Sequence, residues 1–147
     1  MGTSFVENKN FGYWAKDAFL EGLLFLLVRE FKKIKDKDEW LTKVMDDWSI
    51  SATAGYMGCV PSNLDEFFDT PSRLNLLRMK LDKIIMELET NEQFLTLDDL
   101  NGNNIGGTPE WVGVNTQGFQ NCAQLMLNLV NGKLKTDPSS PVDYWSF

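Results

Sequence analysis

The stretch that decides the fold covers residues 18–28 and reads AFLEGLLFLLV, a run that is apolar on nearly every side of a helix. A helix that is apolar all round lies buried in its domain, whereas a surface helix keeps a polar face. We therefore predict a central helix from about Phe11 to Lys35, which becomes amphipathic in its last turns. A membrane span needs about 20 mainly apolar residues. This run is shorter and contains Glu21, so we expect no membrane segment.

Further helices are predicted after this central one. Apolar residues recur with helical spacing from Trp40 to Trp48, directly behind Asp38, which can cap a helix start. Because the connection to the first helix is short, we expect the two helices to pair antiparallel. Thr70 followed by Pro71 is also typical of a helix start. Additional helices are expected at residues 62–68, 70–88 and 115–130.

The segment between residues 91 and 114 breaks the helical pattern, because it is rich in Asn, Asp and Gly. Such residues favour turns, and we predict either a short β-hairpin or a long loop there. Residues 136–147 form a Pro- and Ser-containing tail with an aromatic end. Residues 1–147 are predicted to form a single all-α domain, a helical bundle of about four to six helices.

The charge of the chain argues against nucleic-acid binding. The 147 residues carry a formal net charge of −7, and the middle third, residues 51–100, holds 4 basic and 9 acidic side chains. Affinity for a phosphate backbone depends on clustered lysine and arginine. We therefore expect no nucleic-acid partner. The acidity instead favours a basic protein as partner.

The chain contains no histidine, which is the usual general base and the commonest metal ligand. Ser-His-Asp, Cys-His and HExxH mechanisms are therefore excluded. The glycines spell no phosphate-binding loop. An EF-hand also fails: with Gly102 at the sixth position, Leu97 and Thr108 would occupy the first and twelfth positions, where carboxylates are required. We expect no cofactor and no metal.

Cysteine usage and the N-terminus indicate the compartment. Cys59 and Cys122 are the only cysteines, and two do not make a disulfide framework in a chain of this length. The N-terminus lacks a basic segment followed by an apolar run, so it does not resemble a secretion signal. These features favour a cytoplasmic protein.

Acidic and aromatic side chains outside the clear helices are the candidates for a binding surface. Tryptophan is enriched in interaction hot spots, and Trp111 and Trp145 lie in irregular segments, although both could instead cover the core. The acidic residues concentrate between Asp65 and Asp99. The predicted partner-binding residues are Asp65, Glu66, Asp69, Asp98, Asp99, Trp111 and Trp145.

Three functions remain open from the sequence. The first is a non-enzymatic acidic protein-binding module, an inhibitor or immunity protein of the antitoxin kind that occludes a basic, toxin-like partner. Small size, acidity and missing catalytic apparatus are general characters of bacterial immunity proteins and antitoxins, and no motif identifies a family. The second is a small enzyme built from carboxylates, Lys or Tyr, with a pocket lined by Tyr56, Met57 and Cys59. The third is a structural subunit that self-associates into a homo-oligomer through its aromatic tail.

Overall fold

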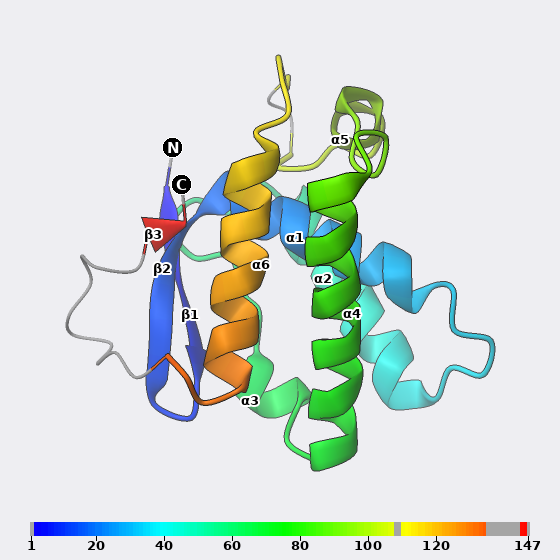
Figure 1. Cartoon of the computed structure of the whole chain (residues 1–147), viewed down its shortest axis with the longest axis vertical. Coiled ribbons are helices and arrows are strands. Elements are labelled where there is room, and N and C mark those ends of the chain that lie inside the picture. Colours follow the sequence, from blue (N-terminus) through cyan, green and yellow to red (C-terminus); the bar gives the residue numbers. More distant parts are fainter. Residues whose placement is uncertain (1, 108–109, 135–144, 147) are drawn as a thin grey trace.

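The chain opens with a β-hairpin where the sequence predicts the beginning of a helix. The computed structural model describes residues 2–107 and 110–134 and, as backbone only, 145–146. Strand β1 (Thr3–Asn8) pairs antiparallel with β2 (Phe11–Lys16), and β3 (Trp145–Ser146) pairs parallel with β2. The all-α prediction is therefore corrected, because the fold is mainly helical with a small sheet along one side (Figure 1).

Two positive backbone angles explain this hairpin. Lys9 and Asn10 connect the strands with φ of 52° and 70°, the two-residue turn whose twist suits an antiparallel pair. Asparagine tolerates this conformation well, but lysine is unusual in it, so the turn has a weak sequence signal. Val6 and Tyr13 lie opposite each other and are fully buried. The aromatic residues just after the turn, which the sequence pattern places in the first helix, therefore belong to β2.

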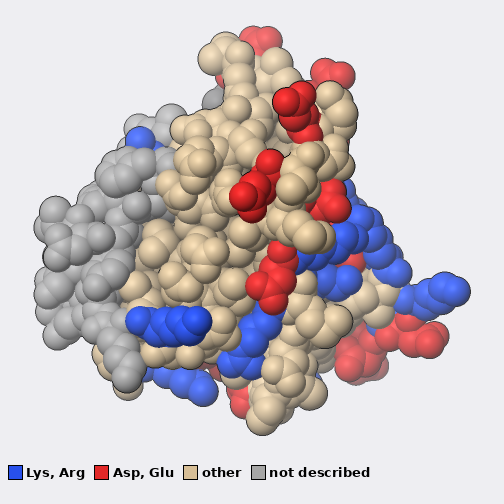
Figure 2. All heavy atoms as spheres, in the orientation of Figure 1, with Lys and Arg blue, Asp and Glu red and all other residues tan. Residues whose placement is uncertain are grey.

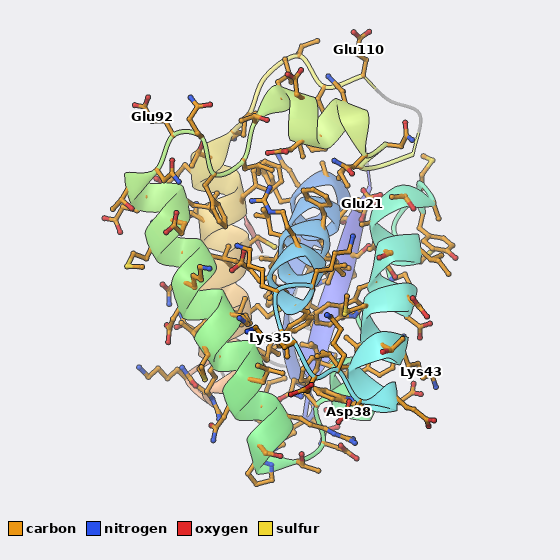
Figure 3. All side chains as sticks on the ribbon, turned by 90° about the vertical axis from the view of Figure 1, so that its right-hand side faces the viewer. Glu21, Lys35, Asp38, Lys43, Glu92 and Glu110 are labelled. Atoms are coloured by element: carbon orange, nitrogen blue, oxygen red, sulfur yellow. The ribbon has the colours of Figure 1, made fainter. Side chains whose placement is uncertain are left out.

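Helix α1 (Asp17–Phe31) is the predicted buried helix, but it begins at Asp17 rather than Phe11 and ends before Lys35. Figure 3 shows it between α2 (Glu39–Thr53) and α4 (Pro71–Thr90). The predicted cap of α2 is confirmed, because the Asp38 carboxylate accepts a hydrogen bond from the Leu41 N–H at 2.8 Å. In the described part of the chain, neither α1 nor any other helix has both the length and the apolar character needed to cross a membrane.

Helices α4 and α6 (Thr116–Val130) lie side by side and cover another face of α1 (Figure 1). Their predicted starts are confirmed by side-chain caps. The Thr70 hydroxyl accepts from the Arg73 N–H at 3.3 Å, and the Asn115 side-chain oxygen accepts from the Gly118 N–H at 3.0 Å. The short helix α3 (Leu64–Phe67) precedes α4.

Glycines bring α1 and α6 into close contact. Gly22 on α1 leaves room for the ring of Phe119, and Gly118 on α6 leaves room for the ring of Phe19. A Cβ atom at either glycine would overlap the ring that faces it. The two rings pack edge to face, with centroids 5.2 Å apart. This crossing fixes α1 against α6 next to Glu21.

The segment between residues 91 and 114 contains a short helix. Helix α5 (Leu97–Gly102) begins with a capping box, in which the Thr96 hydroxyl accepts from the Asp99 N–H at 3.1 Å and the Asp99 carboxylate accepts from the Thr96 N–H at 2.9 Å. No strand lies in the described part of this segment. The hairpin alternative at 91–114 is therefore wrong, and the residues that follow α5 form a loop.

Candidate functional site

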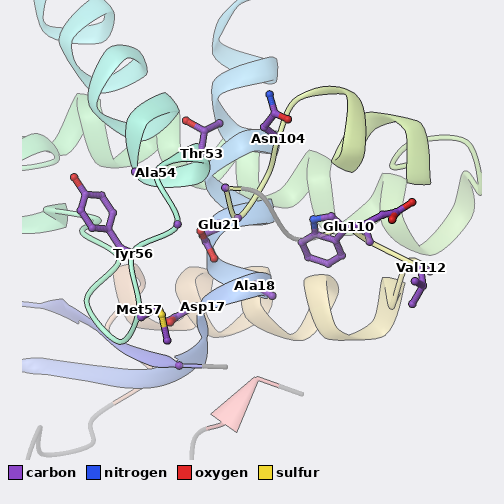
Figure 4. Close-up of a pocket in the computed structure, with 16 residues that line it drawn as sticks. Asp17, Ala18, Glu21, Thr53, Ala54, Tyr56, Met57, Asn104, Glu110 and Val112 are labelled. Carbon is purple, nitrogen blue, oxygen red and sulfur yellow. The ribbon is translucent and has the colours of Figure 1, made fainter.

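A pocket of ≈970 Å³ lies where three segments meet near the start of α1 (Figure 4). Helix α1 contributes Asp17 and Glu21 to its wall. The connection from α2 to α3 contributes Tyr56 and Met57, and the loop after α5 contributes Trp111. This volume and the mixture of apolar walls with a few acidic groups are typical of sites that bind small ligands.

Glu21 is the buried acid of this pocket. Its side chain projects from α1 into the space between the two loops (Figure 4), and the residue is only 4% exposed. Among the described residues, its Oε2 atom has no hydrogen-bond partner. Burial, and after it the negative charge of Asp17, raise the pKa of Glu21 to about 7. Near neutral pH, Glu21 is therefore divided between its neutral acid and its anion.

Asp17 differs from Glu21 because both of its oxygens are engaged. One oxygen accepts a hydrogen bond from the Ser4 hydroxyl at 2.6 Å, and the other accepts from the Gly58 N–H at 2.8 Å. The Ser4 hydroxyl in turn accepts from the Val60 N–H at 2.8 Å. Asp17 thus joins the hairpin, α1 and the α2–α3 connection. It positions the floor of the pocket and places a negative charge one helical turn before Glu21.

Trp111 forms a half-buried wall of the pocket. Its indole N–H donates to the Ile105 carbonyl at 2.8 Å, and the Asn101 side chain bonds both its backbone N–H, at 2.8 Å, and its carbonyl, at 3.0 Å. The ring packs against Phe119, with centroids 5.8 Å apart. Trp111 therefore contacts the edge of the core, and its predicted role in partner binding stays a prediction.

Each of the predicted acidic residues near α3 has a hydrogen-bond or ion-pair partner within the fold. Asp65 accepts two hydrogen bonds from the hairpin and its turn. Glu66 lies 3.7 Å from the ammonium of Lys43, and Asp69 lies 3.0 Å from the guanidinium of Arg73. Two of these three acids, Glu66 and Asp69, are therefore balanced by a nearby cation, whereas Asp65 is held by uncharged donors.

Asp98 and Asp99 lie on α5, at the opposite end of the molecule from α3 (Figure 1). Asp99 caps its helix and lies 3.4 Å from the Arg29 guanidinium, whereas Asp98 is exposed. The structure therefore does not bring the predicted partner-binding residues into one surface. The side chain of Trp145 falls outside the described residues, as does most of the aromatic tail, so self-association through that tail stays a prediction.

The α5 end carries an excess of negative charge, because Asp99 is the one carboxylate there with an ion pair among the described residues, to Arg29. From residue 84 to residue 132 the sequence contains six carboxylates and no lysine or arginine. Figure 3 shows two of these carboxylates at this end of the molecule and Lys35 and Lys43 toward the other end, and Figure 2 shows acidic side chains gathered over the upper part of one face. The surface that we call the acidic end consists of Glu87, Glu89, Glu92, Asp98, Asp99 and Glu110.

The two carboxylates that the pocket brings together, Asp17 and Glu21, are not among the residues that the sequence predicts for a site. In the sequence, Asp17 falls inside the first predicted helix, and Glu21 stands out only as the charge that interrupts the apolar run. A signal was present, because Glu21 interrupts an apolar run and Asp17 stands four residues earlier, on the same face of a helix. The loops that close the pocket over them have no comparable signal, because they come from distant parts of the chain.

No protein-family model, no curated protein and no solved structure matches this chain. Within the described residues, no three side chains of His, Cys, Asp or Glu are grouped so that they could hold a metal ion. The pocket offers carboxylates beside apolar and aromatic walls, a combination suited to binding positive charge or to moving protons.

Proposed function

We propose that this protein is a non-enzymatic binding protein that engages a basic protein partner through its acidic end. The observation that supports this is the charge distribution. Residues 84–132 carry six carboxylates and no lysine or arginine, and among the described residues only one of the six, Asp99, has an ion pair, with Arg29. At the α3 end, Glu66 and Asp69 both pair with cations. Unbalanced charge on one surface accelerates encounter with an oppositely charged partner and disfavours like-charged ones. The proposed partner is accordingly a protein rather than a nucleic acid or an anionic membrane.

Exposed apolar side chains accompany this charge. Leu97 on α5 is 38% exposed, and Val112 in the following loop is 96% exposed. Protein interfaces combine an apolar centre with a polar rim. Trp111 precedes Val112 in the chain and is fixed in place by Asn101. These residues complete the proposed surface, from which the acids of α3 are omitted.

A more specific form of the proposal is an inhibitor or immunity protein of the antitoxin kind, which occludes a basic toxin in the cytoplasm. Its support is the small size of the chain, the net charge of −7 and the absence of histidine. Such a protein acts by covering a basic surface of its partner. It needs charge complementarity and fast association and requires no catalytic group.

The test measures binding to basic proteins encoded next to this gene. In the double variant Glu92→Lys/Asp98→Lys, two exposed carboxylates of the acidic end become cations. We expect the association rate with the partner to fall at least about tenfold at low salt, because electrostatic steering acts mainly on that rate. Surface-based binding kinetics at two salt concentrations provide the measurement.

The matched control is Glu66→Lys/Asp69→Lys, which makes the same change of charge at the α3 end. We expect it to alter the association rate by less than about threefold, because the two ends are separated by the length of α4. The proposal is wrong if the two double variants weaken binding equally, or if none of the basic proteins encoded next to this gene binds the wild-type chain.

A second candidate function is a small enzyme that uses the carboxylates of the pocket. It is favoured by the pKa of Glu21, which burial and Asp17 raise to about 7, because a general acid or base works best near the operating pH. Tyr56 and Met57 line this pocket, as the enzyme hypothesis expects, whereas Cys59 is exposed and stands outside the wall. An enzyme of this kind would lose turnover in Glu21→Gln while still binding its substrate.

A further inference from the structure

We propose that the pocket at Glu21 binds an organic cation, an ammonium or guanidinium group carried on an apolar body. The site lies on α1 and the loops around it. It shares Glu110, Trp111 and Val112 with the proposed partner surface, but its central residue, Glu21, is not part of that surface, and the proposal does not depend on a protein partner. Three features of the described residues support it: the charge of the wall, its apolar and aromatic surface, and the unpaired oxygen of Glu21.

The charge of the wall selects the sign of the ligand. Asp17, Glu21 and Glu110 line the pocket, and none of its lining residues is a lysine or arginine. Inside a partly enclosed space, such carboxylates act on a ligand with less screening than they would in water. A cation is therefore attracted, and an anion is repelled.

The walls around these carboxylates fit an apolar body. Tyr56 and Trp111 offer aromatic rings, and Met57, Ala18 and Val112 add aliphatic surface. An ammonium or guanidinium group near a tryptophan or tyrosine face gains cation–π attraction in addition to its ion pair. A volume of ≈970 Å³ accommodates a small organic molecule and exceeds what a bare metal ion needs.

Glu21 supplies an acceptor that the fold leaves unsatisfied. Buried polar atoms almost always have a hydrogen-bond partner, so an exception points to a missing group. Here Oε2 of a residue that is only 4% exposed lacks one among the described residues, and the side chain projects into the pocket (Figure 4). Asp17, by contrast, is already bound by Ser4 and Gly58. Because Oε2 is itself covered, a small turn of the side chain toward the open part of the pocket would let an N–H group of a bound cation satisfy it.

Binding of a cation should release a proton from Glu21. The other titratable side chains that face the pocket are Asp17 on the same helix, Tyr56 from the α2–α3 connection and Glu110 from the loop after α5. Because the pKa of Glu21 is about 7, this residue changes its charge between pH 6 and pH 8. The affinity for a cation should therefore increase about tenfold over this range.

The test uses the full chain and three probes of similar size: 2-phenylethylammonium, neutral 2-phenylethanol and anionic 3-phenylpropionate. Titrations at pH 8 are followed by heteronuclear NMR of the backbone amides. We expect the ammonium probe to shift the resonances of pocket residues and to bind at least about tenfold more tightly than the alcohol, with the carboxylate weakest. Equal affinity for the three probes, or shifts confined to another surface, would overturn the proposal.

The variant Glu21→Gln keeps the shape of the side chain and removes its charge. We expect its Kd for 2-phenylethylammonium to rise about tenfold at pH 8 and to become independent of pH between 6 and 8. Glu66→Gln removes one charge at the α3 end and should bind like the wild type. The amide spectrum shows whether each variant is folded, and the comparison of the three probes on the wild-type chain holds whatever the variants do. Unchanged binding by folded Glu21→Gln contradicts the proposal.

The cation could belong to a free small molecule or to a lysine side chain of a protein. Titration with the peptide acetyl-Ala-Lys-Ala-amide distinguishes these sources, because tighter binding of the peptide indicates a side chain and tighter binding of 2-phenylethylammonium indicates a small molecule. Both results support a cation site, and failure of both ligands to bind overturns it. None of these measurements involves Glu92 or Asp98, so a failure here leaves the proposed partner surface standing.

Discussion

Helix α1 carries two buried glutamates whose surroundings differ completely. Glu30 is 0% exposed, and its carboxylate lies 2.6 Å from the ammonium of Lys33 and 2.7 Å from that of Lys83. Burial by itself would raise the pKa of Glu30, but the hydrogen bonds and charges of the two lysines outweigh burial and lower it. Glu21 is 4% exposed and has no such cation among the described residues, and burial and the charge of Asp17 raise its pKa to about 7.

Both carboxylates are buried, so burial does not separate a structural carboxylate from a candidate site. What separates them is whether a nearby cation balances the negative charge. Lys83 comes from α4, so its ion pair with Glu30 ties that helix to α1, and the charge of Glu30 is already balanced within the fold. Glu21 faces a pocket that contains two further carboxylates and no cation among its lining residues. The same residue type on the same helix thus stabilises the fold at one end and remains available for binding at the other.

The largest expected effect comes from making Glu30 resemble Glu21. The double variant Lys33→Met/Lys83→Met leaves the Glu30 carboxylate buried without a partner, and we expect the free energy of unfolding at pH 7 to fall by about 3–5 kcal/mol. The folded-state pKa of Glu30 should then lie above its unfolded value, because burial is no longer opposed. The loss should therefore shrink as the pH falls through this raised pKa. Urea unfolding between pH 5 and pH 8 provides the measurement.

The control for this variant is Lys32→Met/Lys80→Met, which removes two positive charges that form no ion pair within the described residues. We expect a change of less than about 1 kcal/mol, as for ordinary surface substitutions. If both double variants destabilise the protein equally, the two lysines that balance the charge of Glu30 are not what distinguishes it from Glu21.

A smaller effect of opposite sign is expected from Glu21→Gln. The folded-state pKa of Glu21, about 7, lies above the ordinary value of 4.5, so the fold favours the protonated acid. The stability that this contributes is complete below the ordinary value and is lost as the pH rises through about 7. The glutamine that replaces this acid does not titrate. Glu21→Gln should therefore match the wild type near pH 4.5 and exceed its unfolding free energy by about 3 kcal/mol at pH 8.5.

Urea unfolding at these two pH values checks the prediction, and Glu66→Gln serves as its control because that carboxylate is exposed. A variant that is destabilised at the higher pH would mean that the ionised Glu21 has a favourable partner in the folded chain. Both buried glutamates of α1 would then have a group that stabilises their charged form, and Glu21 would not differ from Glu30.

Elements that depend on local signals could be predicted from the sequence, whereas contacts between distant residues could not. Local signals predicted α2, α4 and α6 correctly, because Asp38, Thr70 and Asn115 cap their own helices within three residues. The hairpin was missed because its turn places Lys9 in a conformation that lysine rarely adopts. Helix α5 was missed because its Asp and Asn residues indicate turns as much as caps.

The candidate site was less predictable than the fold. The apolar run indicates that Glu21 and the neighbouring residues are buried. Glu30 lies in the amphipathic end of the predicted helix, where an exposed side chain is expected, but the structure buries it. Whether a buried carboxylate is compensated depends on a residue such as Lys83, far away in the chain. Long-range pairing of this kind leaves no periodic pattern. The acids of α3 and α5 belong to the same acidic third of the sequence, yet the fold places them at opposite ends of the molecule (Figure 1).

The smallest effect that we predict concerns the packing that holds Glu21 in place. Gly22 faces the ring of Phe119, which is fully buried and lies between Phe19 and Trp111. In Gly22→Ala the new Cβ overlaps this ring, and the ring cannot move without displacing its neighbours. Overpacking costs about 1–3 kcal/mol, whereas the better helix propensity of alanine returns about 1 kcal/mol. We expect a net loss of up to about 2 kcal/mol in the free energy of unfolding.

Gly102→Ala is the matched control, because no atom lies within 4 Å of a Cβ built at that glycine. Helix propensity then acts alone and should stabilise the protein by up to about 1 kcal/mol. Opposite signs for the two variants in urea unfolding would show that α1 is held rigidly against α6 next to Glu21. The carboxylate then cannot relieve its burial by moving its helix, and only a proton or a bound cation can. Equal signs would mean that α1 shifts easily, and the raised pKa of Glu21 would need another cause.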